Sequence, residues 1–197
     1  MKVITFVYGV LCYAAFFVVF LVVTFFMANL FVPKTIDSGA EIGMLPALGI
    51  NALLLTLFAI QHSVMARPAF KAWWTKIIGK AAERSTYVLF SSLALALLVW
   101  QWQPVKTVVW QIENETLATA VLGLFFLGNG IVFLSSFMIN HFDLFGLKQV
   151  YENLIGKKPE GQHFTTNYLY QIVRHPIMLG FLIMLWAAPT MTVGHLF

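Results

Sequence analysis

The chain has 197 residues, of which 60% are hydrophobic and only 10% are charged. A soluble domain of this size usually carries about a quarter charged residues, so the composition excludes an ordinary soluble protein and indicates an integral membrane protein. The net charge of +4 does not indicate a nucleic-acid partner, because the basic residues lie beside hydrophobic runs rather than on a patch interleaved with aromatic residues.

Four long hydrophobic segments and a shorter fifth predict an all-α bundle of about five transmembrane helices in a single membrane domain, residues 1–197. The predicted spans are residues 4–32, 44–66, 85–103, 117–139 and 176–197. The first is far longer than the ~7–15-residue apolar region of a signal peptide, so we expect it to be a span. Cys12, the one cysteine, lies inside this span, and we interpret it as a packing thiol.

The connections between these segments differ in charge. Lysine and arginine collect in residues 67–84 and 140–175, whereas residues 33–43 and 104–116 carry one each. Because positive charge is retained on the cytoplasmic side, we expect the N-terminus and both basic connections to be cytoplasmic. The stretch "ARPAFKAWWTKIIGKAAER" also places aromatic residues at helical spacing among lysines, which is typical of an amphipathic interfacial helix.

The fifth segment begins at Pro176 and is interrupted by Pro189. The residues between the two prolines would form about 18 Å of helix at 1.5 Å per residue, which is too short for a bilayer core of about 30 Å. The segment therefore either kinks and continues, or breaks at "APT" and turns back.

Ionisable residues gather at the predicted cytoplasmic ends of three separate segments. His62 lies near the end of the second span, His141 and Asp143 follow the fourth, and Arg174 and His175 precede the fifth. Ionisable groups near hydrocarbon are costly and default to a functional hypothesis. We therefore expect these five side chains to meet in one site at the cytoplasmic face.

Each of these residues also has a structural interpretation. Arg174 can snorkel towards water, although a cation at a helix N-terminus opposes the macrodipole and favours an anionic partner. His175 precedes Pro176, and proline suits the first position of a helix. His62 can belong to an interhelical hydrogen-bond cluster, and Asp143 can cap a short helix over "LFGLKQVYENL".

Taken together, these residues suit a ligand that carries both a positive charge and a carboxylate. Arginine pairs with carboxylates, and the faces of nearby aromatic residues, including Tyr151, attract cations. Asp143 can hold an amine or ribose hydroxyls, so a sulfonium ligand suits the mixture. The chain has no glycine-rich dinucleotide loop and no GxxxxGK[ST] loop, which excludes the soluble nucleotide-binding architectures.

"RHPIMLG" resembles the R-H-P-x-x-x-G signature of the isoprenylcysteine carboxyl methyltransferase-like membrane methyltransferases. Four stretches are similar to the bacterial methanethiol S-methyltransferases of that superfamily: "LFAIQHSVMARPAFKAWWT", "ERSTYVLFSSLALALL", "NHFDLFGLKQVY" and "RHPIMLGFLIMLWAAPTMTVGHLF". They are spread over residues 55–197. The resemblance implies that S-adenosylmethionine methylates methanethiol to dimethyl sulfide at the cytoplasmic face of the bacterial inner membrane. It implies a small thiol and the lipid bilayer as partners, and no obligate protein partner.

The resemblance also assigns residues to roles. It implies that the residues of the R-H-P-x-x-x-G signature contact the cofactor. These residues are Arg174, His175, Pro176 and Gly180, and we add the aromatic Tyr151 to the cofactor-binding set. In the family, the segment after "TMTVGHL" continues into another membrane helix and a paired-glutamate segment that helps to enclose the cofactor. That segment is absent from residues 1–197.

For the chemistry, we expect an in-line displacement in which the thiol sulfur attacks the methyl carbon of the sulfonium. A free thiol has a pKa near 8.5 or higher, so a nearby base raises the reactive fraction. We assign His62 as that base, with Asp143 or His141 as the residue that orients it, and we expect no metal.

Two other classes of function remain open at this point. The first is a metal- or haem-binding membrane protein, with His62, His141 and His175 as ligands and Asp143 as a fourth. The second is a non-catalytic membrane component of nitrogen-oxide metabolism, a role that the superfamily resemblance also implies. A proton-coupled transporter fits less well, because transport requires polar groups near the midplane.

Overall fold

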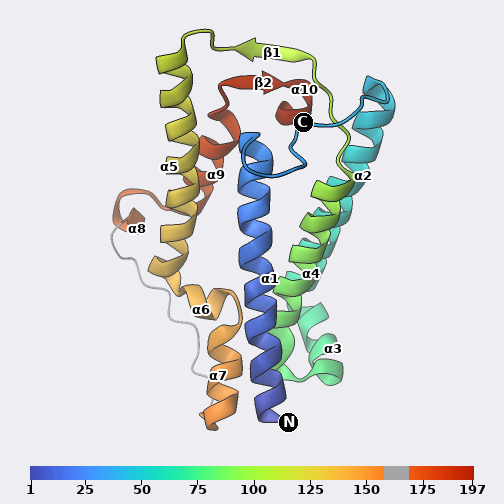
Figure 1. Ribbon diagram of the computed structural model, residues 1–197. Coiled ribbons are helices and arrows are strands. Elements are labelled where there is room, and N and C mark those ends of the chain that lie inside the picture. The colour runs from blue at the N-terminus through green and yellow to red at the C-terminus, as the bar shows by residue number, and fades with distance from the viewer. Residues whose placement is uncertain (158–168) are drawn as a thin grey trace.

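Long apolar runs form helices here because a helix satisfies its own backbone hydrogen bonds in lipid. The computed structural model describes residues 1–157 and 169–197. Within these residues, four helices are long and apolar enough to cross a membrane (Figure 1). They are α1 (Lys2–Ala28), α2 (Met44–Ala66), α4 (Lys80–Gln101) and α5 (Glu115–Ile139). The structure confirms the prediction of an all-α membrane protein.

Shorter elements connect and follow these helices. The helices among them are α3 (Pro68–Ile78), α6 (His141–Leu144), α7 (Leu147–Ile155), α8 (Leu169–Ile172), α9 (Pro176–Trp186) and α10 (Val193–Leu196). The strands are β1 (Val108–Gln111) and β2 (Thr190–Thr192). Helix α3 covers the stretch that the sequence predicts as an amphipathic helix, and none of its residues is fully buried.

Helix α1 lies at the centre of the bundle, with α2 and α4 on one side and α5 and α9 on the other (Figure 1). Helix α4 packs against both α1 and α2, whereas α9 packs against α5. The N-terminus, α3, α6 and α7 lie at one end, and β1, β2 and α10 lie at the opposite end. Helix α3, from the first basic connection, and α6 and α7, from the second, therefore share one end with the N-terminus, whereas α8 lies beside α5 (Figure 1).

Two helix boundaries differ from the predicted spans for identifiable reasons. Helix α1 ends at Ala28 instead of Val32, because Asn29 takes a left-handed conformation with φ of 56° and closes the helix. Helix α4 begins at Lys80 rather than at residue 85. Its first turn is polar but consists of lysine, alanine and glutamate, which are strong helix formers that a hydrophobicity pattern overlooks.

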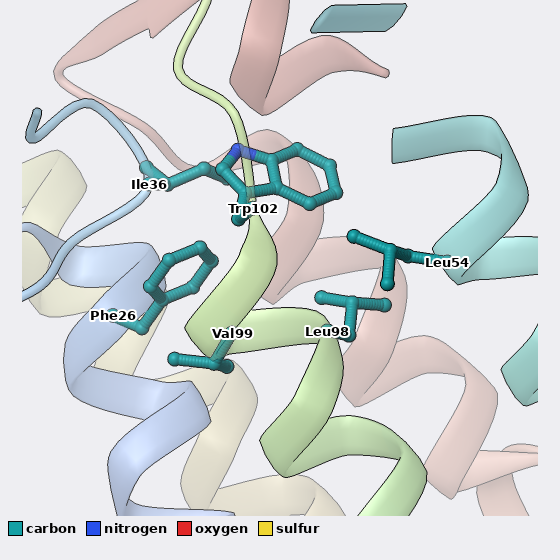
Figure 2. Packing of buried hydrophobic residues seen from close by; sticks show 6 residues of the cluster. All are labelled: Phe26, Ile36, Leu54, Leu98, Val99 and Trp102. Carbon is teal, nitrogen blue, oxygen red and sulfur yellow. The ribbon is translucent and has the colours of Figure 1, made fainter. Parts of the chain in front are cut away.

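The main hydrophobic core joins α1, α2 and α4 near the end that carries the strands. Figure 2 shows its six buried residues, which are Phe26, Ile36, Leu54, Leu98, Val99 and Trp102. Ile36 comes from the loop after α1, so this loop folds back over the helix ends rather than extending away from them. Asn51 on α2 adds two hydrogen bonds with the main chain of Gln103, at 2.8 and 2.9 Å.

The fifth predicted segment, residues 176–197, is broken near Pro189 as predicted. Helix α9 ends at Trp186, and its eleven residues are too few to cross a bilayer by themselves. The chain then forms β2, which pairs with β1 in antiparallel register, with Val108 opposite Thr192 and Gln111 opposite Thr190. The sequence did not predict this pairing.

Helices α5 and α9 approach each other through two glycines. A Cβ atom added to Gly180 would lie 2.7 Å from the carbonyl oxygen of Gly128, and one added to Gly128 would lie 2.8 Å from the carbonyl oxygen of Gly180. Small residues allow such close backbone contact between membrane helices. The glycine of the R-H-P-x-x-x-G signature therefore has a packing role in this structure.

This contact predicts the effect of Gly180→Ala. The added methyl group would force α9 away from α5, so we expect the variant to be about 1–3 kcal/mol less stable, as is usual for overpacked interiors. Unfolding of the detergent-solubilised protein by heat measures the change. Gly130→Ala is the matched control on α5, because a Cβ atom there meets nothing within 4 Å. Equal stability of the two variants would contradict the packing role.

Candidate active site

His62 on α2 faces two hydroxyl groups of α4. The Oη atom of Tyr87 lies 3.0 Å from both ring nitrogens of His62, and the Oγ atom of Ser91 lies 3.3 Å from Nδ1. Tyr87 and Ser91 are four residues apart in one helix, so they project from the same face. Tyr87 is buried, whereas His62 remains exposed. The imidazole is thus held on one side and open on the other.

Arg84 lies one turn before Tyr87 and connects this group to the chain that follows α5. Its guanidinium carbon lies 5.0 Å from the centre of the Tyr87 ring, in a cation–π arrangement. Its Nε–H donates to the carbonyl oxygen of Leu144 at 2.6 Å. Arg84 belongs to α4 rather than to the basic connection before it, and for this reason it faces the bundle.

The turn between α6 and α7 lies directly against α4. Ser85 donates a hydrogen bond to the carbonyl oxygen of Gly146 at 3.2 Å. Gly146 has φ of 89°, and a Cβ atom there would come within 2.6 Å of the Ser85 nitrogen. Only glycine allows both this backbone conformation and this approach. The contact holds the α6–α7 turn next to Arg84 and Tyr87.

His141 is enclosed between α1 and α5, and only 2% of its surface is exposed. Its Nδ1 atom lies 2.7 Å from the Oγ atom of Ser136, and its Nε2 atom lies 2.8 Å from the Oη atom of Tyr13. The Ser136 hydroxyl donates to the carbonyl oxygen of Phe133, so it accepts from Nδ1–H, and the Tyr13 hydroxyl donates to Nε2. Burial lowers the pKa of His141 below that of an exposed histidine. Burial thus favours the neutral form of this ring, which is hydrogen-bonded through both nitrogens and sealed from solvent.

Asp143 is also buried, and its partner is an amide. The Oδ1 atom accepts a hydrogen bond from Nε2 of Gln149 at 2.8 Å. The alternative interpretation, that Asp143 caps the helix over "LFGLKQVYENL", is wrong. Helix α7 begins after Gly146, which makes no side-chain capping bond, and Asp143 lies in the short helix α6 instead.

Aromatic side chains lie between the residues around His62 and those around His141. Phe145 lies 4.7 Å from the His141 ring and stacks on Phe16 at 3.8 Å between ring centres. Phe145 and Phe16 also pack against the buried cluster that contains Tyr87. The groups around His62 and His141 are therefore neighbours at one end of the bundle, separated by a layer of phenylalanine rings.

The R-H-P positions lie elsewhere. Arg174 and His175 are exposed just before α9, and Pro176 is buried at the first position of that helix. Helix α9 packs on α5, and α1 separates this pair from α2 and α4 (Figure 1). The structure therefore does not bring Arg174 together with His62. Tyr151, on α7, is 52% exposed, and its ring lies 6.4 Å from that of Phe6.

The histidines named in the metal hypothesis lie in three different surroundings. His62 faces Tyr87, His141 is sealed between α1 and α5, and His175 is exposed beside α9. Across residues 1–157 and 169–197, no group of three or more histidine, cysteine or acidic side chains could hold a metal ion. The described geometry gives the metal or haem alternative no support.

Tyr87, Ser91 and Arg84 were not among the predicted site residues. A pattern that could have identified them is present in "ERSTYVLFSS", where the three residues are separated by three and then four positions. This spacing places polar groups on one face of a helix. Hydrophobicity does not distinguish this pattern, because tyrosine and serine also occur in ordinary membrane helices.

Comparisons with known proteins identify relatives over nearly the whole chain. The family described as NnrU protein matches residues 51–196. Methanethiol S-methyltransferase 1 of Bradyrhizobium diazoefficiens is 53% identical over 195 residues, which are 99% of this chain and 68% of that protein. The methanethiol S-methyltransferase of Crocosphaera subtropica is 49% identical over 189 residues, which are 96% of this chain and 74% of that protein.

A more distant relative carries a different name. Nurim of Mus musculus is 34% identical over 166 residues, which are 78% of this chain and 61% of that protein. No solved structure matches the chain. The NnrU match includes His62, Tyr87 and the R-H-P positions, and the resemblance inferred from the motifs is confirmed. The chain belongs to the NnrU family of isoprenylcysteine methyltransferase-like membrane proteins and is a relative of the bacterial methanethiol S-methyltransferases.

Proposed function

We propose that this chain transfers a methyl group from S-adenosylmethionine to methanethiol and releases dimethyl sulfide. The observation that carries the proposal is 53% identity with Methanethiol S-methyltransferase 1 over 99% of the chain. That name states the acceptor and the kind of transfer. The choice of S-adenosylmethionine as the donor comes from the resemblance of the R-H-P motif.

The exposed residues before α9 suit the amino-acid end of this donor. Arg174 is exposed, and a guanidinium can pair with a carboxylate through two parallel hydrogen bonds. Tyr151 is exposed on α7 and offers an aromatic face to a cation. Asp143 suits the donor less well, because its buried carboxylate is already hydrogen-bonded to Gln149. When bound, S-adenosylmethionine supplies a methyl group on a positively charged sulfur.

His62 is the residue that we assign to the acceptor thiol. A thiol with a pKa near 8.5 or above is mostly protonated at pH 7, and the thiolate is the nucleophile. Nε2 of the exposed His62 imidazole can take the S–H proton, so that the sulfur attacks as the thiolate. In the structure, the groups within hydrogen-bond distance of this ring are the hydroxyls of Tyr87 and Ser91 rather than Asp143 or His141.

The assignments of His62 and Arg174 are independent of each other. One concerns activation of the acceptor, and the other concerns binding of the donor. Helix α1 lies between α2, which carries His62, and the α5–α9 pair, beside which Arg174 lies (Figure 1). Each assignment therefore needs its own variant and its own measurement.

We place this chemistry at the cytoplasmic face of a bacterial inner membrane. Helices α3, α6 and α7 lie at the end of the bundle that holds the N-terminus (Figure 1), and His62 lies in the last two turns of α2, directly before α3. The lysines and arginines of α3 and its flanks lie at that end, and positive charge is retained in the cytoplasm.

The reaction itself can be tested with the purified chain in detergent. With methanethiol and methyl-labelled S-adenosylmethionine, we expect labelled dimethyl sulfide, which gas chromatography of the headspace detects. Omission of methanethiol should abolish the labelled product. Binding of the donor without any labelled dimethyl sulfide would contradict methyl transfer and favour a non-catalytic component.

Two substitutions separate the proposed roles. Loss of a general base usually costs about 10²–10⁴-fold, so His62→Ala should lower the turnover number by that order while donor binding persists. Arg174→Ala should weaken donor binding by about tenfold to a hundredfold, the effect of losing a hydrogen bond to a charged group.

Calorimetric binding of S-adenosylhomocysteine and the rate of dimethyl sulfide formation distinguish these outcomes. Arg67→Ala, at another exposed arginine beside a helix start, is the control for a general loss of positive charge. Normal turnover by His62→Ala would remove the base assignment. Unchanged binding by Arg174→Ala would remove the donor assignment.

A further inference from the structure

We propose that Tyr87 is the positioning residue for His62, and that its hydroxyl, together with that of Ser91, stabilises the imidazolium formed when His62 takes the thiol proton. This inference rests on the proposed function. It names two residues of α4 that the sequence motifs did not assign to the site.

The geometry places a hydroxyl oxygen next to each ring nitrogen. The Tyr87 oxygen is 3.0 Å from Nδ1 and from Nε2, and the Ser91 oxygen is 3.3 Å from Nδ1. A hydroxyl group can donate to a bare nitrogen or accept from N–H without moving its oxygen. Both oxygens can therefore remain in place while the ring changes from neutral to charged.

The proton balance of the step is simple. The S–H bond of the thiol breaks, its proton forms a new N–H bond at Nε2 of His62, and the electron pair stays on sulfur as the thiolate. The resulting imidazolium has two N–H donors and no acceptor. Nδ1–H faces the hydroxyl oxygens of Tyr87 and Ser91, at 3.0 and 3.3 Å, and Nε2–H faces the thiolate. Neither proton is then left without a partner near hydrocarbon, where an unpaired polar group is costly.

The position of the Tyr87 hydroxyl is fixed by contacts that do not involve the hydroxyl. Its ring packs with Met65 and Val88 and against Phe145. Arg84 lies over its face at 5.0 Å and is itself held by the carbonyl oxygen of Leu144. A phenylalanine ring would keep the packing and the cation–π contact. Tyr87→Phe therefore removes the hydrogen bond and little else.

The chain contains a matched histidine–tyrosine pair that serves as a control. Tyr13 donates to Nε2 of His141 at 2.8 Å, but that ring is buried, neutral and bonded through both nitrogens. Tyr13→Phe makes the same chemical change beside a histidine that we do not assign to proton transfer. It also tests the earlier hypothesis that His141 orients the base, since in that case this variant would alter the pH profile.

The test compares the pH dependence of turnover for the wild type, Tyr87→Phe and Tyr13→Phe, with methanethiol and labelled S-adenosylmethionine. At pH 7 we expect Tyr87→Phe to be at least tenfold slower than the wild type, with unchanged binding of S-adenosylhomocysteine. Above the pKa of the thiol, the substrate ionises without a base, so the deficit should narrow to within about threefold near pH 10. Tyr13→Phe should follow the wild-type profile.

A purely structural role for Tyr87 would lower the rate by the same factor at every pH, and that result would overturn the inference. Wild-type rates in Tyr87→Phe at pH 7 would overturn it as well. If the wild-type chain forms no dimethyl sulfide, the proposed function itself fails. If the wild type forms dimethyl sulfide and Tyr87→Phe shows no deficit that depends on pH, the inference alone fails.

A measurement without turnover checks the contact itself. In protein labelled with ¹⁵N-histidine, Tyr87→Phe should shift the ring nitrogen resonances of His62 and leave those of His141 in place, and Tyr13→Phe should do the reverse. Ser91→Ala should reproduce part of the shift of the His62 resonances. Ser91→Thr, which keeps a hydroxyl group, should leave these resonances at their wild-type positions. Unchanged His62 resonances in Tyr87→Phe would overturn the inference independently of activity.

Discussion

The close approach of the α6–α7 turn to α4 is the contact on which the rest of this end of the molecule depends. Gly146 meets the backbone of Ser85 at a distance that no side chain would allow. This contact brings the carbonyl oxygen of Leu144 to Arg84, and Arg84 in turn covers the ring of Tyr87. The imidazole of His62 is thus positioned by a series of contacts that begins at Gly146, which lies between α6 and α7.

His62 and His141 show how the same kinds of partner can serve different roles. Both His62 and His141 face a tyrosine and a serine hydroxyl. His141 is sealed by phenylalanine rings, so its hydrogen bonds hold α1 and α5 together. His62 keeps one exposed side, so a proton can reach it from outside the bundle. Access, rather than the identity of the partners, separates a structural histidine from a candidate base.

The sequence allowed correct prediction of the helical class, the four long helices and the break near Pro189. These features depend on the length of an apolar run and on the backbone restriction at proline, and both act within a few residues along the chain. It did not reveal the β1–β2 pair, since pairing between residues near 110 and near 190 depends on the whole bundle. It predicted that His62, Arg174 and Asp143 lie at similar depth. Depth does not fix position around the bundle axis, and α1 lies between α2, which carries His62, and α9, which Arg174 precedes (Figure 1).

The β1–β2 pair has a consequence for the order in which the chain is built. Strand β1 precedes α5, whereas its partner β2 comes after α9, so the backbone groups of residues 108–111 lack their final partners until residues 190–192 have been synthesised. Domains emerge from the ribosome N-terminal first. Helices α1 to α5 can therefore enter the membrane before β1, in the connection between α4 and α5, has a strand to pair with. Pairing with β2 then completes the end of the bundle opposite the N-terminus.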